Sequence, residues 1–228
     1  MDHVTEAEKK YTGGYVNCTL KATKSWLAFN DRHITRKIRI RHADDAQSRQ
    51  VLEERVPTKE ELRKMLLSAT KQSRVAIALM AFSGVRPETL GNYRGTDDLR
   101  IADLPELQIE KGKVDFRRIP AVVLVRADLS KTRQPYFTFL AEEGCRYVAD
   151  FFEERLRKGE ALSQHSPLVP PTKSTEKSFL RTTVIGRRIR VAMRRAGYGS
   201  RPYALRCYFD SELLLAESKG VITRDFRI

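Results

Sequence analysis

The chain has 228 residues, and its 43 lysines and arginines outnumber its 29 aspartates and glutamates, which gives a formal net charge of +14. Hydrophobic residues make up 41% of the sequence, enough for a packed core, and no apolar run has the length of a membrane span. The three cysteines and four histidines lie far apart, without the spacing of metal ligands or of a disulfide framework. We therefore expect no metal, no cofactor and no membrane partner, and a reducing, cytoplasmic compartment.

Residues 1 to about 30 are predicted to form one helix after an irregular start. Apolar residues follow two neighbouring helical stripes, one of which contains Trp26 and Phe29. Two apolar faces need two packing partners. We therefore interpret this segment as the last helix of a small helical domain whose earlier helices precede the sequence.

Basic and apolar residues alternate in the next stretch, from position 36 to 41. This period of two is typical of a β-strand, and cations would keep an edge strand soluble. The alternative is a basic linker that crosses a phosphate backbone between two domains, and the pattern does not decide between the two. The polar residues 44–54 extend the linker. The cations of the stretch are Arg36, Lys37, Arg39 and Arg41.

The main domain is predicted to open with a capped helix and a buried one. Thr58 and Glu61 fit a capping box, followed by a helix through Ala69. The unbroken apolar run 75–82 predicts a core helix, with Gly84 as its C-cap and Pro87 in the first turn of the next helix.

Arg86 would lie on the corner between these two helices. A guanidinium is rarely buried beside a core without a partner, because burying a lone charge costs several kcal/mol or more. Glu88 or Asp103 would be a structural partner; otherwise Arg86 awaits an anion from outside.

Short extended segments are predicted after this corner. Residues 99–104 and 107–109 form the first, with Gly112 turning the chain, and 121–125 and 135–140 form two antiparallel strands. The polar loop between these strands carries Lys131 and Arg133 near its tip. A lysine there is either a solubilising residue or a functional one.

Three helices complete the predicted domain. Residues 142–158 are amphipathic, 183–196 form a basic helix, and the last helix starts near Tyr203 and carries Leu205, Phe209, Leu213 and Leu214. Arg206 falls in the first turn of that last helix.

Positive charge is concentrated in this part of the chain. Between positions 173 and 206 there are ten cationic residues and one carboxylate, Glu176, a net charge of +9. A folded protein with such a stretch is expected to bind nucleic acid, and a merely solvated basic surface is the alternative. Arg86 and Arg206 could grip one phosphate from two sides, because guanidinium forks match phosphate oxygens. The ten cations are Lys173, Lys177, Arg181, Arg187, Arg188, Arg190, Arg194, Arg195, Arg201 and Arg206.

With these residues in view, the sequence resembles the tyrosine recombinase (phage integrase-like) family, in an archaeal or archaeal-virus-like form. Three motifs carry the resemblance, in the family's order within residues 57–228. They are Ser83-Gly84-Val85-Arg86-Pro87-Glu88-Thr89-Leu90, Ser130-Lys131-Thr132-Arg133 and Tyr203-Ala204-Leu205-Arg206.

The resemblance implies a mainly α fold with a small antiparallel β-sheet (α+β), a catalytic domain preceded by a partial helical core-binding domain. Residues 1–42 would be the C-terminal part of the core-binding, DNA-binding domain and 43–56 a linker. Residues 57–228 would be the catalytic domain without its C-terminal nucleophile segment.

The resemblance also implies DNA integration or site-specific recombination through a covalent 3′-phosphotyrosine, without metal or cofactor. Arg86 and Arg206 would stabilise the transition state at the phosphate, and Lys131 would protonate the leaving 5′ oxygen. The partner is double-stranded DNA, held in the full-length protein by a tetramer near the nucleoid. Besides the cations of 36–41, the expected DNA contacts are Arg133, Lys173, Lys177, Arg181, Arg187, Arg188 and Arg201.

The sequence also departs from the family. Tyr203 occupies the usual His/Lys position, Thr89 a position where a carboxylate is common, and no tyrosine follows Tyr208. We therefore expect a chain truncated at both ends and inactive by itself. The alternatives are a non-catalytic DNA-binding accessory protein, a nucleophilic Tyr203 or Tyr208, and a basic helical protein unrelated to DNA.

Overall fold

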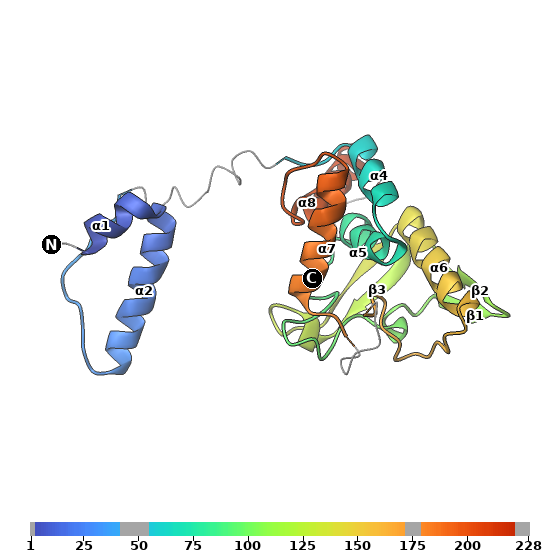
Figure 1. Ribbon diagram of the computed structural model, residues 1–228, viewed down its shortest axis with the longest axis horizontal. Helices are drawn as coiled ribbons and strands as arrows, with labels where there is room; N and C mark the ends of the chain where they lie inside the picture. Colours follow the sequence, from blue (N-terminus) through green and yellow to red (C-terminus); the bar gives the residue numbers. More distant parts are fainter. Residues whose placement is uncertain (1–2, 42–54, 172–178, 222–228) are drawn as a thin grey trace. The chain divides into compact units, whose positions relative to one another are not determined.

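The computed structural model describes residues 3–41, 55–171 and 179–221. The chain divides into two compact units, Met1–Glu54 and Arg55–Ile228. In Figure 1 the first unit is drawn in blue and the second runs from cyan to red. The expected linker 43–56 lies largely outside the described residues, as do Lys173 and Lys177.

The described residues of the first unit form two helices, α1 (His3–Lys10) and α2 (Gly13–Phe29), so the prediction of a single helix is wrong. Thr12 separates them, because its side-chain oxygen accepts a hydrogen bond from the Tyr15 backbone at 3.4 Å and so caps a new helix. Of the described residues of this unit, Val16 alone is buried, and Phe29 is 88% exposed. The apolar faces of α2 are therefore largely uncovered within this unit.

The stretch 36–41 is irregular, so the edge strand, one of the two alternatives for this stretch, is wrong. A strand needs backbone partners. Here the Arg41 N–H instead donates to the Glu8 side chain of α1 at 2.6 Å. All four cations of the stretch are exposed.

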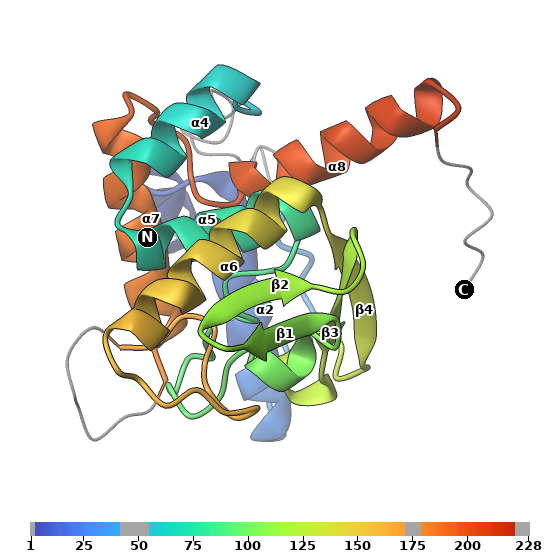
Figure 2. The same ribbon diagram turned by 90° about the vertical axis from the view of Figure 1, so that its right-hand side faces the viewer.

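The second unit is built around α5 (Lys71–Ser83), of which every residue from Val75 to Ser83 is buried. Helices α4 (Lys59–Ser68), α6 (Glu142–Arg157), α7 (Thr182–Arg195) and α8 (Ala204–Ser218) pack against it, and Figure 2 shows α6 crossing in front of α5. The predicted capping box is confirmed: Thr58 accepts from the Glu61 N–H at 3.2 Å, and Glu61 accepts from the Thr58 N–H at 2.9 Å.

Two antiparallel hairpins complete the part of this unit that the structure describes. Strand β1 (Leu107–Glu110) pairs with β2 (Lys113–Phe116), and β3 (Ala121–Val125) pairs with β4 (Tyr136–Leu140), with Val123 opposite Thr138. The predicted α+β class, mainly α with small antiparallel sheets, is confirmed. The extended segment expected at 99–104 is wrong, because residues Ile101–Asp103 form a 3-10 turn, η1, that the Asp103 carboxylate closes by accepting the Arg100 N–H at 2.9 Å.

Helix α8 packs only by its first half. Leu205 is fully buried, but Leu213 is 43% and Leu214 58% exposed, because the second half projects from the unit (Figure 2). Over the described part of the chain, no helix is both long and apolar enough to cross a membrane. Within the same residues, no group of three potential histidine, cysteine or carboxylate ligands could hold a metal ion.

Candidate phosphate-binding site

The corner that precedes Arg86 is set by Gly84. Gly84 caps α5 with φ +66°, a left-handed conformation that favours glycine, and its N–H donates to the Met80 carbonyl. A Cβ atom at this position would lie 2.4 Å from Cδ1 of Phe209 in α8. Glycine therefore both reverses the chain and lets α8 approach.

A tight turn follows, where the sequence predicted a second helix. The Thr89 N–H donates to the Arg86 carbonyl at 3.0 Å, and the Leu90 N–H donates to the Pro87 carbonyl at 3.2 Å. Thr89 is fully buried, and its hydroxyl donates to the Leu129 carbonyl at 3.4 Å. This bond fastens the Arg86 turn to the loop that carries Lys131.

The partly buried Arg86 side chain makes no hydrogen bond or ion pair with any described residue. Its two expected partners are engaged elsewhere. Glu88 accepts from the Tyr93 hydroxyl at 3.1 Å, and Asp103 is bound by Arg126. The structural pairing expected for Arg86 is therefore wrong, and its guanidinium is left for an anion.

Arg86, Lys131 and Arg133 line one hollow of the second unit. One wall comes from residues of the segment 92–97, and the other from residues of the segment 128–133, which contains part of η2 (Ala127–Leu129). Lys131 is exposed and makes no contact with a described polar group. Arg133, with φ +58°, donates to the Asp128 carbonyl at 3.2 Å and lies 3.9 Å from its carboxylate.

Arg206 meets the same corner from α8. Its Nε donates to the Gly84 carbonyl at 2.5 Å, across 122 residues of sequence. Its guanidinium carbon lies 5.6 Å from the centre of the Tyr203 ring, a cation–π contact that fixes the arginine further. Arg206 is thus bound to the Gly84 corner that Arg86 follows in the chain, and neither arginine has a carboxylate partner among the described residues.

The two candidate tyrosines differ in their surroundings. Tyr203 precedes α8 and is 46% exposed. Tyr208 is buried, and burial, reinforced by the nearby negative charge of Glu212, raises the pKa of its phenol to about 12. Because a nucleophilic tyrosine must lose its proton, this environment disfavours Tyr208 in that role.

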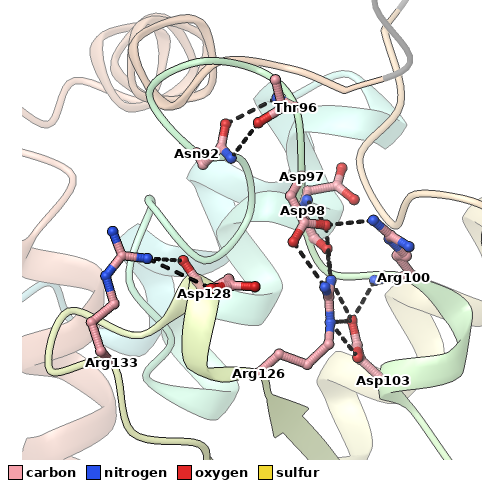
Figure 3. Close-up of polar contacts among 9 residues, drawn as sticks. All are labelled: Asn92, Thr96, Asp97, Asp98, Arg100, Asp103, Arg126, Asp128 and Arg133. Carbon is pink, nitrogen blue, oxygen red and sulfur yellow. Dashed lines mark hydrogen bonds and ion pairs between the residues drawn. The ribbon is translucent and has the colours of Figure 1, made fainter.

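Sequence reasoning missed a network of carboxylates and arginines beside the hollow (Figure 3). Arg126 donates through both terminal nitrogens to Asp97, at 2.8 and 3.0 Å, and through Nε to Asp103 at 3.1 Å. Arg100 donates to Asp97 at 2.7 Å. Burial opposes ionisation of Asp97, but the hydrogen bonds from Arg126 and Arg100 outweigh it, and the pKa of Asp97 is lowered.

Asp98 is the exception in this network. It is fully buried, and neither carboxyl oxygen has a hydrogen-bond partner among the described residues. Burial, and then the neighbouring charge of Asp97, raise its pKa to about 9. Asp98 is therefore a neutral acid at pH 7. The only signal in the sequence was the Asp97-Asp98 pair before buried Leu99, which does not say what either carboxyl meets.

The other predicted DNA contacts do not join the Arg86 hollow. Arg187 and Arg188 line a different hollow with Lys71 and Lys158, and Arg188 donates to the Gln72 side chain at 2.6 Å. Burial and the charge of Arg187 lower the pKa of Arg188. The cations of 36–41 belong to the first unit, while exposed Arg181 and Arg201 lie in the second.

Comparison with known proteins yields structural relatives only. No protein-family model and no curated protein matches the sequence. The structure of XerA recombinase aligns over 91% of this chain with a TM-score of 0.50 and 18% identity, and the integrase from mycobacterium phage Brujita over 91% with 0.50 and 17%. A lambda integrase(75–356) dimer bound to a COC′ core site aligns over 95% with 0.52 and 13%.

The chain has the fold of these recombinase and integrase structures. It spans 63% of the XerA recombinase chain and 60% of the phage Brujita integrase chain, less than two thirds of either. At this level of identity the likeness establishes the recombinase fold, and the roles of individual residues rest on the geometry of the Arg86 corner.

Proposed function

We propose that this chain supplies the DNA-binding and phosphate-clamping machinery of a tyrosine recombinase, which breaks and rejoins DNA in site-specific recombination or integration. One observation carries the proposal. Arg86 has no partner among the described residues in a hollow that it shares with Lys131, while Arg206 is fastened to Gly84 of the same corner. Guanidinium groups without a carboxylate partner are suited to phosphate, because each offers paired donors in a fixed plane.

In the proposed chemistry, a tyrosine oxygen forms a bond to the scissile phosphorus and the bond to the 5′ oxygen breaks. Arg86 and Arg206 neutralise the charge that develops on the non-bridging oxygens, and preorganised donors of this kind are each worth about 3 kcal/mol. Lys131, exposed at the rim of the hollow, donates a proton to the departing 5′ oxygen. Tyr203 takes the position of the family's His or Lys and donates a hydrogen bond to the phosphate.

We infer that neither Tyr203 nor Tyr208 is the nucleophile. The Tyr203 ring faces the guanidinium carbon of Arg206, 5.6 Å from its centre, and Tyr208 is buried with a raised pKa. The same two observations favour the second candidate function, a non-catalytic DNA-binding accessory protein on the recombinase fold.

We further propose that residues 1–42 form part of a core-binding domain, 43–56 a linker and 57–228 the catalytic domain. The full-length protein would act on double-stranded DNA as a tetramer, at the nucleoid. Exposed cations of residues 36–41, with Arg133, Arg181, Arg187 and Arg201, would contact the DNA backbone outside the clamp.

The clamp is tested by the salt dependence of duplex binding, measured by fluorescence anisotropy between 0.05 and 0.3 M NaCl. The affinity falls as salt rises, and each lost phosphate contact reduces the magnitude of the slope of log K against log salt by about 0.9. We expect this loss for Arg86→Ala and for Arg206→Ala. Arg157→Ala is the matched control, because Arg157 is exposed at the C-terminal end of α6. The other end of α6 begins beside α5, where the Ala141 N–H donates to the Phe82 carbonyl. A helix of this length places Arg157 ~24 Å from that end. Equal slopes for all variants would contradict the clamp.

Cleavage separates the two candidate functions. On a nicked suicide duplex, the 228-residue chain is expected to trap no covalent adduct. A chain extended by a C-terminal segment with a tyrosine is expected to trap one, and Arg86→Ala in the extended chain to abolish it. An extended chain that binds DNA with the expected salt slope but never forms an adduct would favour the accessory protein.

A further inference from the structure

The hollow that contains Arg86 holds another unpaired cation, Arg94. Arg94 is exposed, lines the hollow, and makes no hydrogen bond or ion pair within the described part of the chain. The carboxylates of the hollow are engaged by other groups, Glu88 by Tyr93, Asp97 by Arg126 and Asp128 by Arg133. Arg86, Arg94 and Lys131 are therefore the charges of the hollow that remain available to a ligand.

The loop that carries Arg94 is held in one conformation by Asn92. The Asn92 side-chain oxygen accepts from the Gly95 N–H at 2.7 Å and from the Thr96 N–H at 3.0 Å, and its amide donates to the Thr96 hydroxyl at 2.9 Å. The backbone closes the loop, since the Asn92 N–H donates to the Asp97 carbonyl at 3.0 Å. Gly95 adopts φ +70° within this loop. Arg94 is thus presented by a preformed turn.

Ion pairs join the two walls of the hollow. Asp97 ends the loop of Arg94, and Arg126 begins the loop of Lys131 immediately after β3. The two-pronged bond between Asp97 and Arg126, drawn in Figure 3, and a bond from Arg126 to the Asp98 carbonyl at 2.5 Å fasten one loop to the other. The Arg94 and Lys131 loops are therefore held together before any ligand arrives.

We infer that Arg94 is a further DNA-binding residue, which contacts a second backbone phosphate beside the phosphate held by Arg86. A phosphodiester carries one negative charge, so the three unpaired cations that line this hollow exceed the charge of a single phosphate. The next phosphate along a DNA strand supplies the additional negative charge. This inference rests on the proposed function, because it places the DNA backbone across the Arg86 hollow.

The test uses the 228-residue chain and a fluorescent duplex in the salt titration described above. For Arg94→Ala we expect a slope smaller by about 0.9, which corresponds to binding ~8-fold weaker at 0.1 M salt and to no loss on extrapolation to 1 M. Arg94→Lys keeps the charge and is expected to keep the slope. Arg157→Ala again serves as the control for the loss of an exposed charge.

Asn92→Ala tests the preformed loop, because it removes three hydrogen bonds and no charge. We expect it to lower the slope as Arg94→Ala does, and the double variant to lose no more than either single one. Cooperative urea unfolding of each variant confirms that it is folded. If each single variant reduces the salt slope in full and the double variant reduces it by the sum of the two, Asn92 does not act through Arg94. That result would overturn the positioning role of Asn92.

The results for Arg86 and Arg94 separate the two proposals. A normal slope for Arg94→Ala, with a reduced slope for Arg86→Ala, overturns the role of Arg94 and leaves the clamp supported. The reverse pattern refutes the clamp while supporting a DNA contact at Arg94. Normal slopes in both variants overturn both proposals.

Discussion

Asp98 provides a test of the buried network that needs no DNA. Its carboxyl group is fully buried without a hydrogen-bond partner in the described structure, and its pKa is raised to about 9. The unfolded value is about 3.9, so between pH 4 and pH 9 the native state keeps a proton that the unfolded state has lost. The contribution of Asp98 to stability is therefore fully present below pH 4 and is lost as the pH rises toward 9.

The magnitude follows from linkage. Within this window the free energy of unfolding falls as the pH rises, by about 3 kcal/mol between pH 5 and pH 7. Asp98→Asn cannot ionise and removes this dependence, while its unpaired amide hydrogens cost about 1–3 kcal/mol at every pH. We expect the variant to be no more stable than the native chain at pH 5 and more stable at pH 7.

Urea unfolding followed by circular dichroism at pH 5, 6, 7 and 8.5 measures these differences. Asp128→Asn is the matched control, because the Asp128 side chain is 86% exposed and its replacement should leave the pH dependence unchanged. Parallel pH dependences for the native chain and Asp98→Asn would refute the reasoning. They would mean that Asp98 is ionised in the folded protein and paired with Arg100 or Arg126.

Three further predictions concern the corner and the helices around it. Gly84→Ala should lower the free energy of unfolding by about 1–3 kcal/mol or more, because it forces a side chain into φ +66° and against Phe209. Urea unfolding measures this loss, and an unchanged midpoint would contradict the packing of α8 against Gly84. Thr58→Ala should cost about 1 kcal/mol with an unchanged m-value, since it removes the N-cap of α4. Tyr203→Phe should leave the salt slope of DNA binding unchanged, because the hydroxyl is uncharged, whereas Tyr203→His in a tyrosine-extended chain should speed cleavage by up to about 10²-fold in a single-turnover assay.

Local patterns predicted most of the second unit. The capping box, the apolar run of α5, the Gly84 cap and the β3–β4 hairpin each depend on neighbouring residues, and each lies where the sequence indicated. Predictions of secondary structure failed where one segment carries residues that favour two different local structures. Thr12 caps a new helix within the stretch expected to be one, and Pro87 opens a turn rather than a helix.

The first unit shows why alternation is a weak signal for a strand. Residues 36–41 have the period of a strand, but a strand also requires a backbone neighbour, and here the Arg41 N–H donates to the side-chain carboxylate of Glu8 instead. The pattern fixes which side chains alternate. It does not supply the partner that would make the alternation a sheet.

By itself, the sequence determined the basic character of the chain, the order of its helices and hairpins, and the two arginines placed at the ends of buried segments. Only the tertiary structure decided which of these arginines is free. Asp103 could have paired with Arg86, but the fold gives it to Arg126, which also takes Asp97 across 29 residues of sequence. A cap or a hydrophobic period acts over a few residues and can be recognised in the sequence. The pairing of charges depends on which buried segments pack side by side, and therefore on the whole fold.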